Sequence, residues 1–219
     1  MATTAPVTNA PVMTAPVTNA PVIGVFGGSF DPIHLGHLLV AEQAREQLGL
    51  SELLFMPAAR SPHKRGQAPA ADAHRRAMVE LAIADHPAFA LSLVDLDRPP
   101  PSYTVDSLAL LHAARPRAEW VLVLGADSLA GLSTWREPAR IAAQARLAVF
   151  ARPGASLDLA ALETRMPFLA GRVTLLEGPR VEISATDIRR RVARGRSIRY
   201  LVPEAVRAYI AAQGLYAAV

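Results

Sequence analysis

The sequence contains no cysteine and a single lysine. Without cysteine the chain can form neither a disulfide nor a thiolate metal site, which fits a reducing compartment. Lys64 is the one lysine, so the other 22 of the 23 basic residues are arginines. The formal net charge is only +4, although the isoelectric point is near 10.1. Basic side chains are therefore available for phosphates, on nucleotides or on nucleic acid, without themselves selecting either.

Long apolar runs are also lacking. None approaches the roughly 20 residues that span a bilayer. The first charged residue is Asp31, so no basic segment precedes an apolar one as in a secretory signal. We therefore expect a cytoplasmic protein with no membrane partner. With 219 residues, 51% of them hydrophobic, the chain is long enough to bury the core of one domain.

The N-terminal segment repeats itself. "TAPVTNAPV" occurs at residues 4–12 and again at 14–22, and its recurring prolines disfavour a helix or a central strand. The repeat stops after two copies, so it does not indicate a solenoid. We predict a flexible tail over residues 1–21 and one domain over residues 22–219, and Met13 is an alternative start.

From Val22 onward, apolar strand-like segments alternate with helical ones. Strands rich in Val, Leu and Ile on both faces, each followed by a helix, predict an α/β fold: a doubly wound, Rossmann-like parallel sheet with helices on both faces. Ligands of such sheets bind at the carboxyl ends of the strands. The strands are expected at 22–26, 52–57, 88–96, 119–128 (running into a loop), 145–154 and 172–178. The helices are expected at 32–48, 71–86, 102–114 with Ser102 as N-cap, 183–195 and 203–214.

The stretch "GGSFDPIHLGH", residues 27–37, leaves the first strand and enters a helix. Gly27 and Gly28 allow close approach of the backbone to a ligand and φ values that other residues avoid. The unpaired amides of a helix start favour an anion. His34 and His37 are three apart, so we expect them on one helical face, where imidazoles can donate hydrogen bonds to phosphate.

Two other interpretations of these histidines exist. Either one could be an ordinary polar residue at a helix start, but a pair flanking glycine after Gly-Gly favours a functional site. A zinc site would need a third protein ligand, and no companion pattern stands out. We therefore expect no metal held by the protein itself.

A second motif, "ISATDIRRR" at residues 183–191, makes the pattern specific. Together the two stretches resemble the signature pair of the nucleotidyltransferase superfamily, with Ile183, Ser184, Thr186 and Arg189 at the matching positions. The chemistry agrees, because hydroxyls and amides at a helix start plus an arginine make a phosphate grip.

Further segments narrow the resemblance to bacterial nicotinate-nucleotide adenylyltransferases. They cover most of the chain from Ile23 to Tyr216: "PAARSPHK", "HRRAMVELAIAD", "PSYTVDSL", "GADSLAGLSTW", "ARPG" and "YLVPEAVRAYIAAQGLY". The resemblance implies transfer of the adenylyl group of ATP to nicotinate mononucleotide, giving nicotinate adenine dinucleotide and pyrophosphate in NAD biosynthesis. It also implies Mg²⁺ carried by the ATP phosphates.

The resemblance assigns roles to individual residues. Catalysis is expected from His34, His37, Lys64 and Arg189. ATP binding is expected from Gly27, Gly28, Ser29, Phe30, Asp127, Ile183, Ser184, Thr186 and Arg189. Nicotinate mononucleotide binding is expected from His63, Lys64, Tyr103, Thr104, Trp135 and Arg152.

Several of these residues also have structural interpretations. Trp135 could be core packing, Tyr103 and Thr104 a helix start, Asp127 a cap and Lys64 a solvated charge. The chain departs from the family at Ala58 and Ala59, where members often carry asparagine, so any acceptor contact by that side chain is absent or made by backbone.

Other functions remain as alternatives. A sister enzyme, such as a pantetheine-phosphate adenylyltransferase or a cytidylyltransferase, shares the two phosphate motifs, but "PSYTVDSL" and "GADSLAGLSTW" argue against it. A nucleotide-binding regulator without catalysis is opposed by the intact set of His34, His37 and Arg189. The arginines between 189 and 199 lack an aromatic platform, so we expect no nucleic-acid partner. A homo-oligomer and acceptance of nicotinamide mononucleotide both stay open.

Overall fold

The fold is built on one parallel sheet. A computed structural model of the chain describes residues 20–59, 70–150, 158–178 and 181–218. Six strands pair in the order β3-β2-β1-β4-β5-β6, and every pairing is parallel. The strands are β1 Val22–Gly28, β2 Glu52–Pro57, β3 Phe89–Leu91, β4 Glu119–Gly125, β5 Arg146–Phe150 and β6 Val173–Leu176. The order reverses between β1 and β4, which creates the crevice where such sheets bind ligands.

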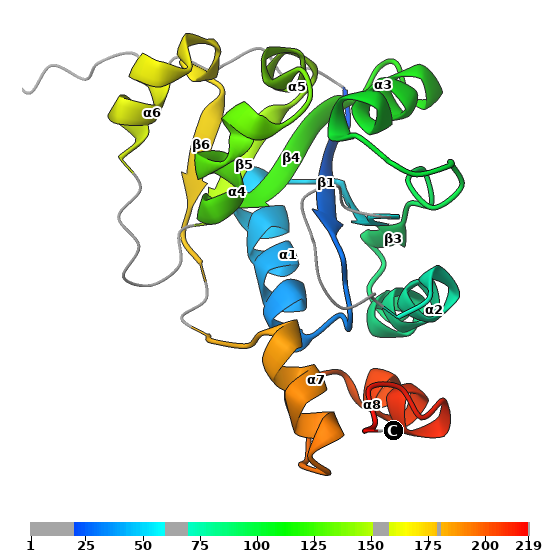
Figure 1. The fold of residues 1–219 in the computed structure, drawn as a ribbon. Helices are drawn as coiled ribbons and strands as arrows, with labels where there is room; N and C mark the ends of the chain where they lie inside the picture. Colours follow the sequence, from blue (N-terminus) through cyan, green and yellow to red (C-terminus); the bar gives the residue numbers. More distant parts are fainter. Residues whose placement is uncertain (1–19, 60–69, 151–157, 179–180, 219) are drawn as a thin grey trace, which may run out of the picture.

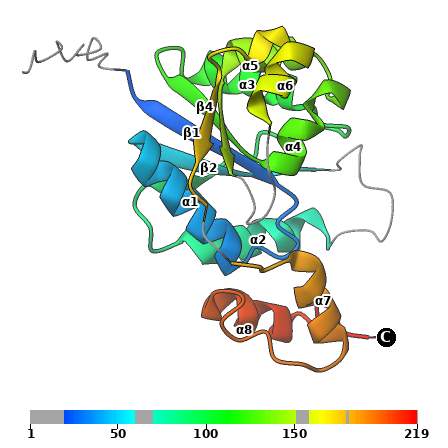
Figure 2. The same ribbon diagram turned by 90° about the vertical axis from the view of Figure 1, so that its left-hand side faces the viewer.

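Helices cover both faces of the sheet, as Figures 1 and 2 show. On one side lie α1 Leu35–Leu48, α2 Asp72–Ile83, α7 Ala185–Ala193 and α8 Glu204–Ala212. On the other side lie α3 Thr104–Ala114, α4 Ala126–Ala130, α5 Pro138–Gln144 and α6 Leu159–Arg165. The expected doubly wound architecture is confirmed.

The central strand β4 shows how the two helical layers are held. Val121 and Val123 belong to the core beneath α1, α2, α7 and α8. Trp120, Leu122 and Leu124, which alternate with them, belong to the core beneath α3, α5 and α6. Because successive side chains of a strand point to opposite faces, a strand buried on both sides is apolar throughout. This explains why "WVLVL" carries no polar residue.

Several expected boundaries are wrong, and three of them have a clear structural reason. The helix expected from Pro32 begins at Leu35, because His34 has extended backbone angles. The strand expected at 88–96 ends at Leu91, since the chain turns immediately afterwards, and the amide of Asp97 donates to the carbonyl of Leu93. Ser102 does not cap α3, because its hydroxyl donates to the carbonyl of Asp95 at 3.0 Å.

Three short helices were not expected from the sequence. They are α4, α5 and α6, each of seven residues or fewer. Helices of this length give too few turns for a clear apolar periodicity. The one local signal for α5 is Pro138 at its first position. The division of the chain at residue 21 stays a prediction, because residues 1–19 lie outside the described residues.

Candidate active site

The loop between β1 and α1 forms the centre of the candidate site. It leaves the carboxyl end of β1 next to β4, at the reversal of strand order. His34 is the N-cap of α1 and His37 lies in its first turn, so the two are not both helical as we expected. Their imidazole rings nevertheless stack, with centroids 3.6 Å apart and planes 23° apart. The loop therefore presents two adjacent imidazoles at the helix start.

His37 is held in one orientation. The backbone N–H of His34 donates to Nδ1 of His37 at 3.2 Å, and the rings of Phe26 and Phe30 lie 5.9 and 5.1 Å away, centroid to centroid. Because Nδ1 accepts a hydrogen bond, the proton of the neutral ring resides on Nε2. In a neutral His37 the donor is therefore Nε2–H, and its use towards phosphate stays a prediction.

His34 is almost fully buried, with 7% of its surface exposed. This burial lowers its pKa to about 4, so the ring is neutral at pH 7. Its Nδ1 has no hydrogen-bond partner among the described residues. A Cβ at position 36 would lie 3.1 Å from that atom, so Gly36 permits the close packing of helix and ring.

The depressed pKa of His34 predicts a pH-dependent stability. The unfolded chain binds a proton near pH 6.5 and the folded chain only near pH 4, so stability is full above about 6.5 and declines as the pH falls towards 4. The loss attributable to His34 is about 3 kcal/mol at most. Urea unfolding at pH 7 and pH 4.5 measures it. His34→Asn should show a smaller difference, and an equal difference in both proteins would contradict the assignment.

Gly28 of this loop serves a different purpose from the one we expected. Neither Gly27 nor Gly28 has a positive φ, and it is Phe30 that has φ 44°. A Cβ on Gly28 would lie 2.9 Å from the ring of Phe30, which is buried. Gly28 is thus required to accommodate Phe30. A Cβ on Gly27 would come no closer than 3.9 Å to its nearest neighbour, Met56, so close approach of a ligand to Gly27 stays a prediction.

The second motif lies against the first. Ser184 caps α7, and its hydroxyl accepts from the amide of Asp187 at 3.2 Å. Arg189 of α7 donates through Nη1 to the carbonyl of Asp31 at 2.6 Å, across 158 residues of sequence. Ile183 borders Gly36 at the start of α1. The helix starts of α1 and α7, both expected to bind phosphate, are therefore neighbours, as Figure 2 shows.

Two buried charges that the sequence analysis missed hold this loop. Arg75 is fully buried and donates to the carbonyls of Ser29 at 2.8 Å and Ala59 at 3.2 Å. Asp31 is also buried, and its Oδ1 accepts from the hydroxyl of Tyr216 and the amide of Ala70. The sequence held one signal: Arg75 occupies the apolar stripe of its helix, three, four and seven residues before buried side chains.

Three of the residues expected to bind the acceptor lie on the side of the sheet that α3 and α4 cover (Figure 2). Tyr103 precedes α3 and Thr104 begins it, while Trp135 follows a short helical turn after α4. Tyr103 and Trp135 are both half-buried and pack against the same core. The guanidinium of Arg136 lies 4.8 Å from the centroid of the Tyr103 ring, close enough for a cation–π contact.

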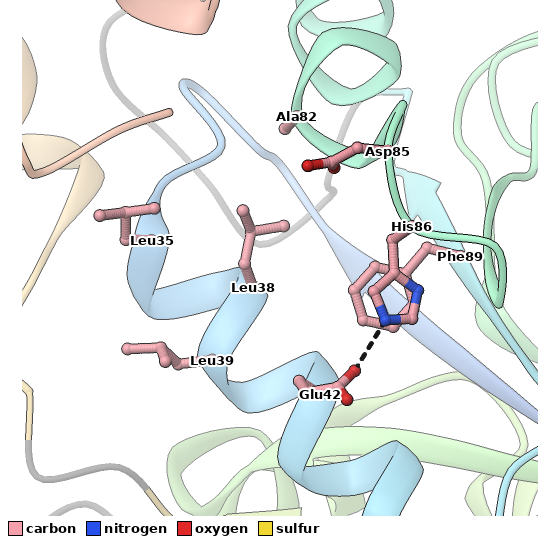
Figure 3. Close-up of a pocket in the computed structure, with 8 residues that line it drawn as sticks. All are labelled: Leu35, Leu38, Leu39, Glu42, Ala82, Asp85, His86 and Phe89. Carbon is pink, nitrogen blue, oxygen red and sulfur yellow. Dashed lines mark ion pairs between the residues drawn. The ribbon is translucent and has the colours of Figure 1, made fainter. Parts of the chain in front are cut away.

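A separate cavity of about 300 Å³ lies between α1 and the end of α2, shown in Figure 3. Leu35, Leu38 and Phe89 make its lining largely apolar. Nε2 of His86 and a carboxylate oxygen of Glu42 lie 3.0 Å apart at its side. None of the residues expected to bind nucleotide lines this cavity, and its apolar character does not suit phosphate.

The sequence of this chain is similar to a known family model and to relatives of known name. The family model described as cytidylyltransferase-like matches residues 25–191. A probable nicotinate-nucleotide adenylyltransferase of Thermomicrobium roseum is 53% identical over 89% of this chain and 91% of its own length. One from Roseiflexus sp. is 52% identical, over 89% and 97% of the two chains. The chain belongs to the nicotinate-nucleotide adenylyltransferase family.

Solved structures related to this family support the fold. Nicotinic acid mononucleotide adenylyltransferase of Plasmodium falciparum, complexed with NaAD, has a TM-score of 0.74 over 90% of this chain and 97% of its own. The same enzyme complexed with APC has a TM-score of 0.73, with the same coverage. Their sequence identities of 20% and 19% mean that they bear on the fold alone.

The remaining family-implied residues divide into two groups. Asp127 is exposed in the first turn of α4, at the end of β4, and the cap of that helix is Gly125. Thr186 is exposed beside Arg189, with its hydroxyl 3.4 Å from Nη2. The expected His63, Lys64 and Arg152 lie outside the described residues.

Ala58 and Ala59, which stand where family members often carry asparagine, both make hydrogen bonds through their backbone. The amide of Ala58 donates to the carbonyl of Gly28 at 2.8 Å, and the carbonyl of Ala59 accepts from Arg75. In this member of the family the backbone of Ala58 thus bonds directly to Gly28, before the loop between β1 and α1, and the backbone of Ala59 is linked to that loop through Arg75.

Neither a metal cage nor a membrane span is found in the described part of the chain. No group of three or more His, Asp or Glu side chains there could hold a metal ion. No helix among those residues is long and apolar enough to cross a membrane.

Proposed function

We propose that this protein transfers the adenylyl group of ATP to nicotinate mononucleotide, releasing nicotinate adenine dinucleotide and pyrophosphate. The observation that carries the proposal is that Arg189 bonds, through the carbonyl of Asp31, to the same loop at the switch point of the sheet that holds the stacked His34–His37 pair. It occurs in a chain about half identical to relatives of that name.

The reaction needs no general base. A phosphate oxygen of nicotinate mononucleotide, already ionised at neutral pH, attacks the α-phosphorus of ATP. The bond from the α-phosphorus to the bridging oxygen breaks, and pyrophosphate leaves with the electron pair. The difficulty is bringing two polyanions into line, so positioning and charge neutralisation dominate the rate enhancement.

The described residues supply donors for this task. His37 offers Nε2–H in a fixed orientation, and neutral His34 lies stacked against it. Arg189 supplies a permanent positive charge from the middle of α7, and Ser184 and Thr186 add hydroxyls at the start of that helix. Such donors act most strongly on charge that develops in the transition state. We propose that Lys64 adds a second positive charge near the reacting phosphates.

We propose that Mg²⁺ enters the site bound to ATP, as part of the MgATP substrate. The described residues offer no carboxylate cage for it, and the buried Asp31 carboxylate already accepts from Tyr216 and Ala70. Mg²⁺ often keeps several waters and is held largely by substrate phosphates. The protein's own residues then bind and orient the nucleotide around the ion.

We propose that the acceptor is recognised at Tyr103, Thr104 and Trp135, with His63 facing its phosphate and Arg152 near the bound nucleotide. The backbone amides at the start of α3 suit the nicotinate carboxylate. Trp135 suits a pyridine ring by stacking. Asp127, at the end of β4, is proposed near the ATP ribose.

Trp135→Ala is expected to raise KM for nicotinate mononucleotide about 10-fold, because ring stacking contributes about 1–3 kcal/mol. KM for ATP should change less than twofold. Since Trp135 also packs against the core, melting temperature is measured alongside. Trp135→Phe, which keeps an aromatic face, should recover most of the loss. Equal changes in both KM values would assign Trp135 to packing.

Pyrophosphate release with ATP and a panel of acceptors tests the function. Nicotinate mononucleotide should give the highest kcat/KM, and the same panel shows whether nicotinamide mononucleotide is used. Release only with phosphopantetheine would indicate the sister enzyme. Release with no acceptor, or with none of the panel, would overturn the proposal. Cytoplasmic placement and a homo-oligomer stay predictions.

A further inference from the structure

We propose that Tyr216, near the end of the chain, is a positioning residue for the ATP-phosphate grip. Its hydroxyl holds the buried Asp31 carboxylate, and Asp31 in turn holds Arg189 where it can meet the phosphates. This inference rests on the proposed function and extends it to a residue that touches neither nucleotide.

The contact joins segments far apart in sequence. The hydroxyl of Tyr216 donates to Oδ1 of Asp31 at 2.6 Å, across 185 residues. The amide of Ala70 donates to the same oxygen at 3.2 Å. Asp31 is only 6% exposed, so water contributes little to its solvation. A buried carboxylate depends on such donors, and losing one is unfavourable.

The other carboxylate oxygen faces the arginine. Oδ2 of Asp31 lies 3.8 Å from Nη1 of Arg189, beyond hydrogen-bonding distance, while Nη1 donates to the backbone carbonyl of Asp31 at 2.6 Å. Arg189 is therefore held by the neutral carbonyl and kept from pairing fully with the carboxylate. About a third of its side chain stays exposed and available to an anion.

Removing the hydroxyl of Tyr216 changes which donors the Asp31 carboxylate can bind. Among the described residues, the charged donor that faces the Asp31 carboxylate once Tyr216 is lost as a donor is the guanidinium of Arg189, and Arg–carboxylate pairs readily become bidentate. Arg189 would then be drawn onto Asp31 and away from the phosphates. Tyr216 thus supplies the hydrogen bond that leaves the arginine for the substrate.

The ionisation of Tyr216 is consistent with this role. Burial, and then the hydrogen bond to Asp31, raise the pKa of Tyr216 far above its ordinary value, despite opposing contributions from Arg189 and Arg75. The phenol therefore keeps its proton and remains a donor at every pH at which the enzyme works.

If Tyr216 had a purely structural role, its hydrogen bond would only anchor the C-terminal segment. A second tyrosine of that segment provides a matched control. Tyr209 of α8 bonds through its hydroxyl to Nδ1 of His74 in α2 at 2.9 Å. Tyr209→Phe removes the same atom from the same region of the chain, but the bond that it breaks is to α2 and not to Asp31. It should lower the melting temperature without changing the kinetic constants.

The test compares the full-length protein with Tyr216→Phe, Tyr209→Phe, Asp31→Asn and the double variant Tyr216→Phe/Asp31→Asn. We expect Tyr216→Phe to raise KM for ATP about 10-fold, with KM for nicotinate mononucleotide changed less than twofold. In the Asp31→Asn background, which has no carboxylate to capture Arg189, the same substitution should change KM for ATP less than twofold.

Three results would overturn the proposal: equal behaviour of Tyr216→Phe and Tyr209→Phe, equal changes in both KM values, or an undiminished effect in the Asp31→Asn background. The shift in melting temperature on adding MgATP gives a second readout that needs no turnover. A wild-type protein that MgATP stabilises but that forms no dinucleotide would refute the proposed function. The role of Tyr216 would then be decided by whether Tyr216→Phe alone loses the MgATP shift.

Discussion

Replacing His37 by alanine should lower kcat about 10²–10³-fold while the protein stays folded, because one preorganised donor to a developing negative charge typically contributes that much. The backbone of His34 holds Nδ1 of His37 and leaves Nε2–H to donate. His34→Ala should have a similar effect, since the stacked rings support each other.

Steady-state pyrophosphate release, with melting temperature measured in parallel, decides this prediction. His86→Ala is the matched control, because His86 also stacks on an aromatic ring and lies beside α1, but belongs to the separate apolar cavity. It should keep near-normal turnover. Near-normal kcat in folded His37→Ala would remove His37 from the catalytic residues.

Arg189→Ala should lower kcat/KM for ATP about 10²-fold or more, because the second phosphate grip loses its permanent charge. Arg189→Lys should recover part of the loss only. An ammonium keeps the charge, but it cannot both bond the carbonyl of Asp31 and present a planar fork to phosphate.

Arg190→Ala provides the comparison, because Arg190 is the next residue of the same helix, is exposed, and pairs with Asp187. It should change kcat/KM for ATP less than twofold. Equal losses in the Arg189 and Arg190 variants would mean that α7 acts through its general positive field and that Arg189 has no specific contact.

The sheet and its functional edge could be predicted because the strands are apolar on both faces. The segment "VLVL" in β4 admits no other environment, and the carboxyl end of β1 then locates the histidine pair. The sequence predicts phosphate binding at residues 27–37 and at residues 183–191, but it is the structure that brings the two segments together. The local apolar pattern of the strands is thus enough to predict the sheet and the strand end at which the histidine pair lies.

The support of the loop could not be predicted, since it depends on contacts between distant residues. Asp31 bonds Arg189 and Tyr216, which lie 158 and 185 residues further along the chain. Sequence pattern likewise assigned unusual backbone angles to Gly28, whereas Phe30 adopts them and Gly28 makes room for its ring. Of the residues that support the loop, Arg75 alone could have been suspected from the sequence, because it is a charged residue on the apolar stripe of its helix.

The central claim is direct transfer between two bound nucleotides, with the histidines handling phosphate and no residue acting as a nucleophile. Its most direct test is the stereochemistry at the α-phosphorus, using ATP with sulfur in place of one α-oxygen and nicotinate mononucleotide as acceptor. A single in-line displacement predicts inversion of configuration in the dinucleotide product. Retention would reveal two displacements through a covalent adenylyl-enzyme and would contradict the account.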